Sequence, residues 1–268
     1  MHVLVTNDDG IESPGLWALV RAIRGAHRGP ITVIAPETEH SSTSMSFPYR
    51  PEHRLRPLAA PADLAEVQVF AHDSSPVACV SAAMLTGACA PIDMVVAGIN
   101  PGLNAGRSVM LSGTVGAAMI GALWGLPAMA VSVQFRPNQP MIWDVAAWAA
   151  EQIFPLARDL RRQHPHPLVV NVNVPHLSFG ELRGIRQTGL SEFFYGPYLS
   201  STQLETHDQI QRYRYQFVRE RVPSFPPDTD EGAVKSGFIS VSLISPMQSV
   251  SLPSLDEALA HLDLGRTA

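Results

Sequence analysis

Cysteine is scarce in this chain, with two residues among 268. Cys79 and Cys89 are ten positions apart, in a stretch that we expect to be helical. This spacing fits neither a disulfide framework nor the CxxC pair of a zinc site. We therefore interpret both residues as buried thiols of a cytosolic protein.

Charge is also sparse, since 16% of the residues are acidic or basic and the net charge is −5. The basic residues are scattered apart from short groups such as Arg158, Arg161 and Arg162, so the chain lacks the basic stripe of a duplex-binding protein. We expect no DNA duplex as a partner, and only a small nucleic-acid ligand. The hydrophobic fraction of 46% indicates a folded globular protein, with one large α/β domain or two small ones.

Long apolar runs are missing except in residues 108–133, where Gly113, Gly121, Gly125 and Pro127 interrupt the run. We interpret that stretch as a helix, a turn and a strand of a globular core rather than as a membrane span. The N-terminus lacks the basic region and the long apolar region of a signal peptide. We therefore expect a cytoplasmic protein that has no membrane partner.

Short apolar runs alternate with helical stretches over the first two thirds of the chain, which is typical of a mostly parallel sheet with helices on both faces. The expected strands are residues 2–6, 31–35, 67–71, 93–97, 128–133 and 168–173. Helices should begin at Pro14 and Pro76, because each follows a serine that can cap the helix. Ligands bind beyond the carboxyl ends of such strands, so we expect a site in loops 7–13, 36–48 and 98–114.

The pattern changes after about residue 180, where aromatic and polar residues cluster and several prolines follow. We interpret residues 1–180 as a Rossmann-like catalytic core and residues 181–268 as a C-terminal region for oligomerisation. That region should contain an extended β-hairpin arm, a strand over residues 237–243 that returns to the core, and a terminal helix over residues 254–262. The aromatic-rich segment 193–225 holds more apolar surface than a lone hairpin can bury, which indicates a partner surface.

Two adjacent carboxylates, Asp8 and Asp9, directly follow the first apolar run of the chain. Neighbouring carboxylates raise one another's pKa unless a positive charge lies close by. A divalent cation is therefore the expected partner of this pair.

Oxygen-bearing side chains also occupy the other two loops. Residues 41–44 are four hydroxyl residues in succession, and Asn100 and Asn104 follow the strand expected at 93–97. Hard oxygen ligands suit Mg²⁺ or Mn²⁺, whereas zinc prefers histidine or cysteine. A site of this composition serves metal-assisted hydrolysis of a phosphate ester.

Several short motifs occur together and in a fixed order along nearly the whole chain. Their residues are Asn7, Asp8, Asp9, Gly10, Pro14, Gly15, Ala35, Pro36, Ser41, Ser44, Ser46, Gly98, Ile99, Asn100, Gly102, Asn104, Gly106, the runs 112–115 and 171–175, Thr229, Asp230, Gly237 and Phe238. In these motifs the chain resembles the family of the stationary-phase survival protein SurE, a metal-dependent nucleotidase. The resemblance agrees with an α/β fold, in which a Rossmann-like, doubly wound, mostly parallel sheet carries an extended C-terminal hairpin arm and a terminal helix.

By this resemblance, Asp8, Asp9, Ser41 and Asn100 bind one divalent metal ion per subunit, Mg²⁺ or Mn²⁺. The reaction is removal of phosphate from nucleoside 5′-monophosphates, and in some members from 3′-nucleotides or short polyphosphate. The resemblance also implies a homodimer or homotetramer with exchanged C-terminal arms. In our mechanistic hypothesis Asp8 and Asp9 are catalytic: Asp8 orients or deprotonates the attacking water, and Asp9 mainly binds the ion.

Five residues are candidates for binding the substrate phosphate, and they are Ser44, Asn104, Ser112, Gly113 and Thr114. Residues 112–114 stand at the entrance of a helix, where backbone amides and the helix dipole favour an anion. Three of them have a structural alternative. Asn104 can stabilise its own turn, Ser112 can cap the helix, and Ser44 can order its loop.

Two residues depart from the family pattern. Ser42 stands where the family has glycine, so the shape of that loop cannot be carried over. Ala78 stands where the family has aspartate, which can alter a subunit contact or substrate preference while the metal ligands are kept. His40 lies next to Ser41, but we interpret it as a surface residue.

Two other functions are compatible with the same loops. A nucleotide-binding regulatory protein would hold its ligand without turnover, but such a protein needs no paired carboxylates at an open metal position. A metal-dependent sugar-nucleotide transferase would form products without free phosphate. The sequence favours a nucleotidase over both.

Overall fold

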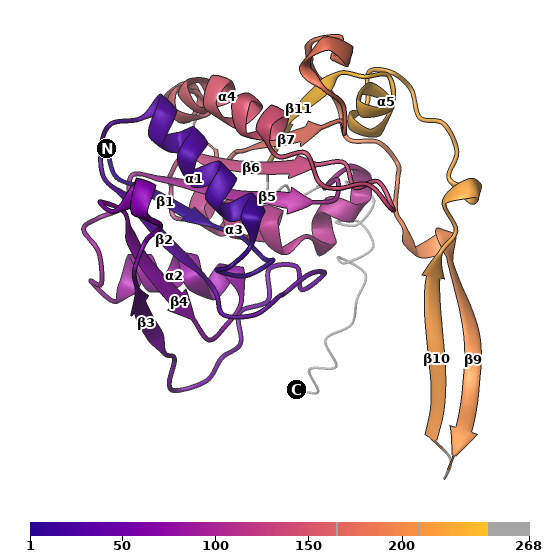
Figure 1. Ribbon diagram of the computed structural model, residues 1–268, viewed down its shortest axis with the longest axis horizontal. Coiled ribbons are helices and arrows are strands. Elements are labelled where there is room, and N and C mark those ends of the chain that lie inside the picture. Colours follow the sequence, from indigo (N-terminus) through magenta and orange to yellow (C-terminus); the bar gives the residue numbers. More distant parts are fainter. Residues whose placement is uncertain (165, 208–209, 246–268) are drawn as a thin grey trace, which may run out of the picture.

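The computed structural model describes residues 1–164, 166–207 and 210–245. These residues form a nine-stranded sheet with helices on both faces and a two-stranded arm that extends away from it (Figure 1). The predicted α/β class with a mostly parallel sheet and a hairpin arm is therefore confirmed. The predicted terminal helix over residues 254–262 lies outside the described residues.

The large sheet is parallel in its centre and antiparallel near its edges. Its strands are β1 (Val3–Thr6), β2 (Ile31–Pro36), β3 (Leu55–Leu58), β4 (Gln68–His72), β5 (Met94–Pro101), β6 (Ala128–Val133), β7 (Val169–Val174), β8 (Ile185–Gln187) and β11 (Ile239–Ile244). Their order is β3-β4-β2-β1-β5-β6-β7-β11-β8. The chain builds outward from β1 in one direction through β2 and β4, and then in the other direction through β5, β6 and β7. The switch point lies between β1 and β5, and such a point is where ligands bind in open α/β sheets.

Two helices cover each face of the sheet (Figure 1). The helices are α1 (Pro14–Ala26), α2 (Pro76–Leu85), α3 (Gly113–Leu123), α4 (Asp144–Gln163) and the short α5 (Asp230–Lys235). Along β1, Val3 and Val5 pack with α1 and α4, whereas Leu4 packs with α2 and α3. This alternation explains why the central strands are continuously apolar, because both of their faces are buried.

Helix boundaries follow the predicted capping residues. Helix α1 begins at Pro14, and α2 begins at Pro76 after Ser75, whose hydroxyl accepts a hydrogen bond from the Ala78 amide at 3.3 Å. Ala78 lies in the first turn of α2 and is buried. Among the described residues, no helix combines the length and the hydropathy needed to cross a membrane.

The two cysteines lie in different surroundings. Cys79 is fully buried within α2, as expected, and burial raises the pKa of its thiol. Cys89 lies beyond the end of α2 and is only half-buried. The expectation that both thiols are buried in a helical stretch is therefore wrong for Cys89.

The region after residue 180 contributes both to the sheet and to the arm. Strands β8 and β11 complete one edge of the large sheet, and β9 (Leu199–His207) pairs with β10 (Ile210–Phe217) to form the arm. The strand expected at 237–243 is thus β11. The arm is exposed along most of its length, as Figure 1 shows. The division of the chain at residue 180 stays a prediction.

Candidate active site

Asp8 and Asp9 lie at the carboxyl end of β1, beside the switch point of the sheet. The turn after them is closed by the Asn7 side chain, which donates to the Gly10 carbonyl at 2.9 Å. Gly10 has a φ of +104°, a conformation that side chains other than glycine rarely adopt. A cavity of about 260 Å³ lies over this turn, and we call it the acidic cavity. Its walls are Asp8, Asp9, Glu39, Ser41, Ser42, Asn100, Pro101, Leu103, Asn104, Ser108, Leu111, Ser112, Phe193 and Tyr195.

Asp8 is held firmly at the floor of the acidic cavity. Its side chain is buried, and Oδ1 accepts a hydrogen bond from the Thr114 hydroxyl at 2.5 Å. Gly113 packs closely against it, since a Cβ at position 113 would lie 2.9 Å from Asp8 Oδ2. Burial raises the pKa of Asp8, while the Thr114 hydroxyl opposes that rise. Gly113 and Thr114 therefore support Asp8 rather than line the cavity.

Asp9 carries a buried oxygen that lacks a partner. Within the described part of the chain, Asp9 Oδ2 has no hydrogen bond. Burial raises the pKa of this carboxyl to about 7, and the charges of Asp8 and Glu39 add to the rise. Buried polar atoms in native proteins are normally paired, so an unpaired carboxylate oxygen in an acidic cavity fits a cation ligand. The residues present therefore suit a hard divalent ion.

Ser41 reaches the cavity from the loop after β2. Its hydroxyl donates to Glu39 Oε1 at 2.7 Å. The loop is anchored on both sides, by the His40 amide bonded to the Asp8 carbonyl at 2.7 Å and by the Ser44 hydroxyl bonded to the Met110 carbonyl at 2.6 Å. These bonds place Ser41 at the rim, whereas Ser44 and His40 lie outside the residues that line the cavity.

Ser42 keeps a backbone shape that suits glycine. Its φ is +61°, in the left-handed region that L side chains seldom occupy. Ser44, two residues later, has a φ of +56°. The loop thus has a left-handed residue at the position where the family pattern has glycine, although this chain has serine there.

Asn100 approaches the cavity from the end of β5. The pairing of β5 with β6 shifts register between Ala97 and Asn100, and such irregularities re-aim side chains near functional sites. The amide nitrogen of Asn100 donates to the Gly102 carbonyl at 2.7 Å, which leaves its side-chain oxygen as the group that can bind a cation. The four predicted metal ligands therefore line one cavity.

Asn104 belongs to a buried network of amides. Its side-chain nitrogen donates to the Ser132 hydroxyl at 2.9 Å, and its backbone amide donates to Asn173 Oδ1 at 2.9 Å. Its carbonyl accepts from the side chains of Asn171 and Asn173, both at 2.9 Å. These bonds give Asn104 a structural role, but they join its loop to β6 and β7 rather than stabilise its own turn, and Asn104 also lines the cavity.

Ser112 is the N-cap of α3, as the structural alternative predicts. Its hydroxyl accepts from the Val115 amide at 3.0 Å, so the N-terminus of α3 opens at the cavity wall. Of the five candidate phosphate ligands, only Asn104 and Ser112 line the cavity. The phosphate-binding roles stay predictions.

The C-terminal region supplies site residues that sequence reasoning missed. Phe193 and Tyr195 line the acidic cavity, together with Glu39 and Ser108 from the loops after β2 and β5. The aromatic cluster was visible in the sequence, but it indicated a partner surface. Its position beside Asp8 depends on how the chain returns to the sheet after β8.

Asp230 ties the C-terminal region to the loop after β5. Its carboxylate is fully buried and accepts the amides of Gly106 at 2.7 Å, Ser191 at 2.9 Å and Glu231 at 2.8 Å. Hydrogen bonds to a carboxylate are stronger than those between neutral groups. Asp230 therefore fixes the loop that carries Asn104 and Ser108. The motif of Thr229 and Asp230 was a sequence signal for this contact.

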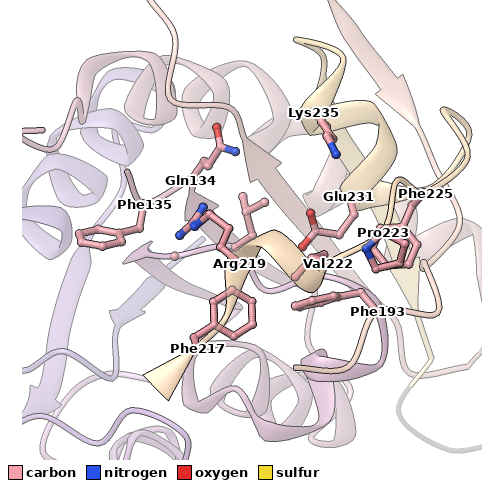
Figure 2. A pocket seen from close by; sticks show the side chains of 12 residues that line it. Gln134, Phe135, Phe193, Phe217, Arg219, Val222, Pro223, Phe225, Glu231 and Lys235 are labelled. Atoms are coloured by element: carbon pink, nitrogen blue, oxygen red, sulfur yellow. The ribbon is translucent and has the colours of Figure 1, made fainter. Parts of the chain in front are cut away.

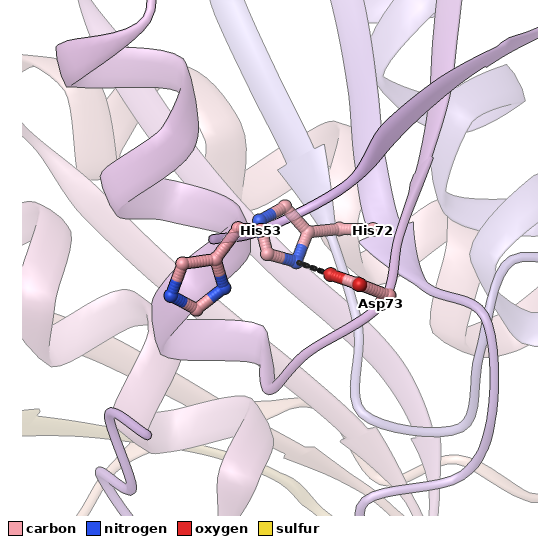
Figure 3. Close-up of side chains that lie close together, drawn as sticks. All are labelled: His53, His72 and Asp73. Atoms are coloured by element: carbon pink, nitrogen blue, oxygen red, sulfur yellow. Dashed lines mark ion pairs between the residues drawn. The ribbon is translucent and has the colours of Figure 1, made fainter. Parts of the chain in front are cut away.

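A second group of possible metal ligands lies away from the acidic cavity. His53, His72 and Asp73 bring their ligand atoms within 4.8 Å of one another (Figure 3). Arg50 already serves this group as a cation, because it donates to Asp73 Oδ1 at 2.7 Å and to His53 Nδ1 at 3.4 Å. We therefore assign the group to an ion-pair cluster. Ala78 lies near these histidines and not in the acidic cavity.

Comparison with known proteins gives consistent results. The model of the family described as "Survival protein SurE" matches residues 3–196. The chain is 34% identical over 252 residues to the 5′-nucleotidase SurE of Dehalococcoides mccartyi, covering 91% of this chain and 88% of the relative. It is 35% identical over 245 residues to the 5′-nucleotidase SurE of Geobacter sulfurreducens, covering 90% of this chain and 87% of the relative.

A solved structure agrees with this fold. The crystal structure of the SurE protein from Aquifex aeolicus superimposes with a TM-score of 0.74 at 25% sequence identity, covering 97% of this chain and 99% of that chain. The likeness therefore extends over nearly the whole length of both chains.

Proposed function

The chain belongs to the SurE family of survival proteins, and from this membership we propose that it is a divalent-metal-dependent 5′-nucleotidase. It would hydrolyse nucleoside 5′-monophosphates to nucleoside and phosphate, and this agrees with the name 5′-nucleotidase that its relatives carry. The observation that carries the proposal is the buried, unpaired Asp9 Oδ2 beside Asp8 in the acidic cavity. Without a cation, this arrangement places two like charges together at a cost in stability.

Asp8, Asp9, Ser41 and Asn100 would hold the ion, which we propose to be Mg²⁺ or Mn²⁺ because all four offer hard oxygen atoms. When bound, a divalent cation supplies positive charge that offsets the charge of the phosphate. The N-terminus of α3 lies at the cavity wall at Ser112, and the positive end of its helix dipole would favour the remaining phosphate oxygens.

Asp8 is the residue suited to act on the attacking water. The Thr114 hydroxyl and the close approach of Gly113 fix its carboxylate, so one oxygen is oriented by a bond while the group faces the cavity. The water oxygen would attack phosphorus in line and give its proton to Asp8. The bond from phosphorus to the nucleoside oxygen would break, and a proton would pass to that oxygen. Positioning and charge neutralisation supply most of the acceleration in phosphoryl transfer.

Finer properties follow from the family resemblance and are proposals too. Nucleoside 3′-monophosphates and short polyphosphate would be further substrates, since the acidic cavity would contact mainly the terminal phosphate. A homodimer or homotetramer is the proposed assembly, and the cytoplasm is the proposed location.

Phosphate release from AMP and GMP tests the proposal directly. We expect release with Mg²⁺ or Mn²⁺ and its loss in EDTA. Nucleotide binding without phosphate release would instead indicate a regulatory binding protein. A product without free phosphate, formed from a sugar nucleotide, would indicate a transferase.

A further inference from the structure

A second cavity, of about 450 Å³, lies beside the acidic cavity. We call it the aromatic cavity, and Figure 2 shows the side chains around it. The two cavities share Leu103 and Phe193 as wall residues. A molecule bound at Asp8 and Asp9 can therefore extend into the aromatic cavity without leaving the protein surface. The combined space suits a ligand with an anionic end and an apolar end.

The walls of the aromatic cavity come from two parts of the chain. Gly102 and Leu103 follow β5, and Gln134 and Phe135 follow β6, so one wall is again the carboxyl edge of the parallel sheet. The opposite wall is formed by residues 217–225 at the base of the arm and by α5. The position of this cavity matches the place where α/β sheets bind the remainder of a ligand.

Phenylalanine rings dominate the surface of this cavity. Phe193 meets Phe225 edge-on with ring centroids 5.9 Å apart, and meets Phe217 edge-on at 6.5 Å. Phe135 lies on the other side of the cavity in Figure 2 and is 46% exposed. A large, partly exposed ring that faces a cluster of rings across a cavity provides a surface on which a flat aromatic ligand can stack.

The aromatic wall is held in place by the acidic-cavity loop. The Phe193 carbonyl accepts the Arg107 amide at 2.7 Å, and Phe193 stacks on Tyr198 with an interplanar angle of 3°. Asp230 binds the amide of Gly106, which precedes Arg107, and the amide of Ser191, which lies two residues before Phe193. Phe193 is thus fixed relative to the acidic cavity, which keeps the two cavities at a constant separation.

Polar groups stand among the rings. The Gln134 side-chain oxygen accepts the His176 amide at 3.2 Å, so its amide nitrogen is directed to donate elsewhere. Burial and the neighbouring Asp230 raise the pKa of Glu231 to about 7. A carboxyl with that pKa can donate or accept a hydrogen bond near neutral pH. Arg219 and Lys235 add positive charge at the same cavity.

We propose that the aromatic cavity binds the nucleobase of the substrate, which stacks on Phe135 while Gln134 and Glu231 bond to its polar edge. A nucleoside monophosphate has a phosphate at one end and a flat aromatic ring at the other, which matches the acidic and aromatic cavities in order. This assignment rests on the proposed 5′-nucleotidase function. Stacking of a base on an aromatic side chain is tolerant of sequence, so purine and pyrimidine nucleotides should both bind.

The test compares two substrates that differ only in the base, AMP and ribose 5-phosphate. Phe135→Ala should lower kcat/KM for AMP by about ten- to hundredfold, the range expected for loss of base stacking, and leave kcat/KM for ribose 5-phosphate unchanged. Phe135→Leu, which keeps apolar bulk without a ring, should lose most of the same activity. Phe135→Tyr should retain it.

Phe179→Ala is the matched control. Phe179 is 49% exposed, close to the exposure of Phe135, and it packs on Trp148 away from both cavities. Its substitution should leave both substrates unaffected. The proposal would be overturned if Phe135→Ala left AMP hydrolysis unchanged, or if that variant lowered hydrolysis of AMP and ribose 5-phosphate equally.

A second readout does not depend on catalysis. Lys235, a wall residue of the aromatic cavity, is the only lysine in the sequence. Adenosine should therefore slow acetylation of Lys235 severalfold but not that of the N-terminal amine, and Phe135→Ala should abolish this protection. An unchanged labelling rate in saturating adenosine would contradict the proposal. If wild-type protein released no phosphate from either substrate, the nucleotidase function would fail, while the protection of Lys235 would still decide the base site.

Discussion

The Asp9 carboxyl has opposite roles in stability and in function. Its pKa is raised from 3.8 to about 7 in the folded chain. The folded metal-free protein therefore binds this proton more tightly than the unfolded chain does. The contribution of this group to the free energy of unfolding is therefore complete below about pH 4 and is lost as the pH rises to about 7.

Asp9→Asn should therefore stabilise the metal-free protein while abolishing phosphate release. In EDTA at pH 8 the variant should melt several degrees above wild type, and the difference should vanish at low pH. Thermal unfolding followed by circular dichroism measures this. Asp63→Asn is the control: Arg21 lowers the pKa of that exposed carboxyl, so the substitution should not stabilise. Equal melting temperatures of wild type and Asp9→Asn at pH 8 would show that the buried charge of Asp9 does not destabilise the metal-free protein.

Ser42 is a second residue with a conformational cost, because its backbone adopts a left-handed conformation that disfavours a side chain. A left-handed φ of +61° costs an L residue about 1 kcal/mol, and glycine avoids that cost. Ser42→Gly should raise the free energy of unfolding by about 0.5 kcal/mol, as measured by urea denaturation, because the relief of about 1 kcal/mol exceeds the roughly 0.5 kcal/mol that glycine gains in freedom in the unfolded chain. Ser46 lies in the same loop but does not have a left-handed φ. Ser46→Gly should therefore lower the free energy of unfolding by about 0.5 kcal/mol, because glycine gains freedom in the unfolded chain. Destabilisation by both variants would contradict this account.

At the scale of elements, α5 acts on the site through one side chain. Asp230 at its first position binds three backbone amides, two of which belong to distant loops. Asparagine in its place would present an amino group to at least one donor. Asp230→Asn should therefore lower the free energy of unfolding by about 2 kcal/mol and reduce kcat/KM for AMP.

Amide hydrogen exchange separates this positioning role from a general loss of stability. Exchange at Gly106 and Ser191 should quicken in Asp230→Asn more than exchange in β1 or β5 does. Asp228→Asn is a matched control, because Asp228 is exposed two residues earlier. Uniform quickening across the sheet would indicate that Asp230 stabilises the fold without positioning the loop.

Elements differ in how well the sequence predicts them. The six strands predicted in the first two thirds of the chain match β1, β2, β4, β5, β6 and β7, because buried apolar residues mark each of them and form a continuous run in the central strand β5. Strands β3 and β8 were not predicted. They are short and largely exposed edge strands, so no alternation of apolar and polar residues marks them.

The site divides in a similar way. Asp8, Asp9, Ser41 and Asn100 could be predicted to meet, because parallel strands bring their carboxyl ends to one edge of the sheet. Phe193 and Tyr195 could not be placed at the cavity, since their position depends on contacts far apart in sequence, such as Asp230 with Gly106. Local pattern predicts where a strand ends, but not which distant segment returns to that end.

At the scale of the whole molecule, the arm of β9 and β10 extends away from the nine-stranded sheet (Figure 1). Tyr213 and Tyr215 on β10 are 47% and 70% exposed. An exposed aromatic hairpin is typical of an interaction surface. This agrees with the proposed homodimer or homotetramer.

Light scattering should give a mass that is a multiple of the chain mass of 29.0 kDa. The double variant Tyr213→Ser and Tyr215→Ser should shift the population toward a smaller species, because it removes apolar contacts between subunits. Tyr49→Ser, at a position that is 97% exposed and lies off the arm, should leave the mass unchanged. A monomeric mass for wild type would contradict the proposed assembly.

The central claim is that Asp8 and its neighbours form a metal-dependent phosphatase site. The most direct measurement is the rate of phosphate release from AMP by wild type and Asp8→Asn across a titration of Mn²⁺, with Mn²⁺ affinity determined by calorimetry on the same samples. The account predicts that wild-type release rises from zero in EDTA with bound Mn²⁺, and that Asp8→Asn loses both affinity and activity. Release that persists in EDTA, or full activity and unchanged Mn²⁺ affinity in Asp8→Asn, would contradict it.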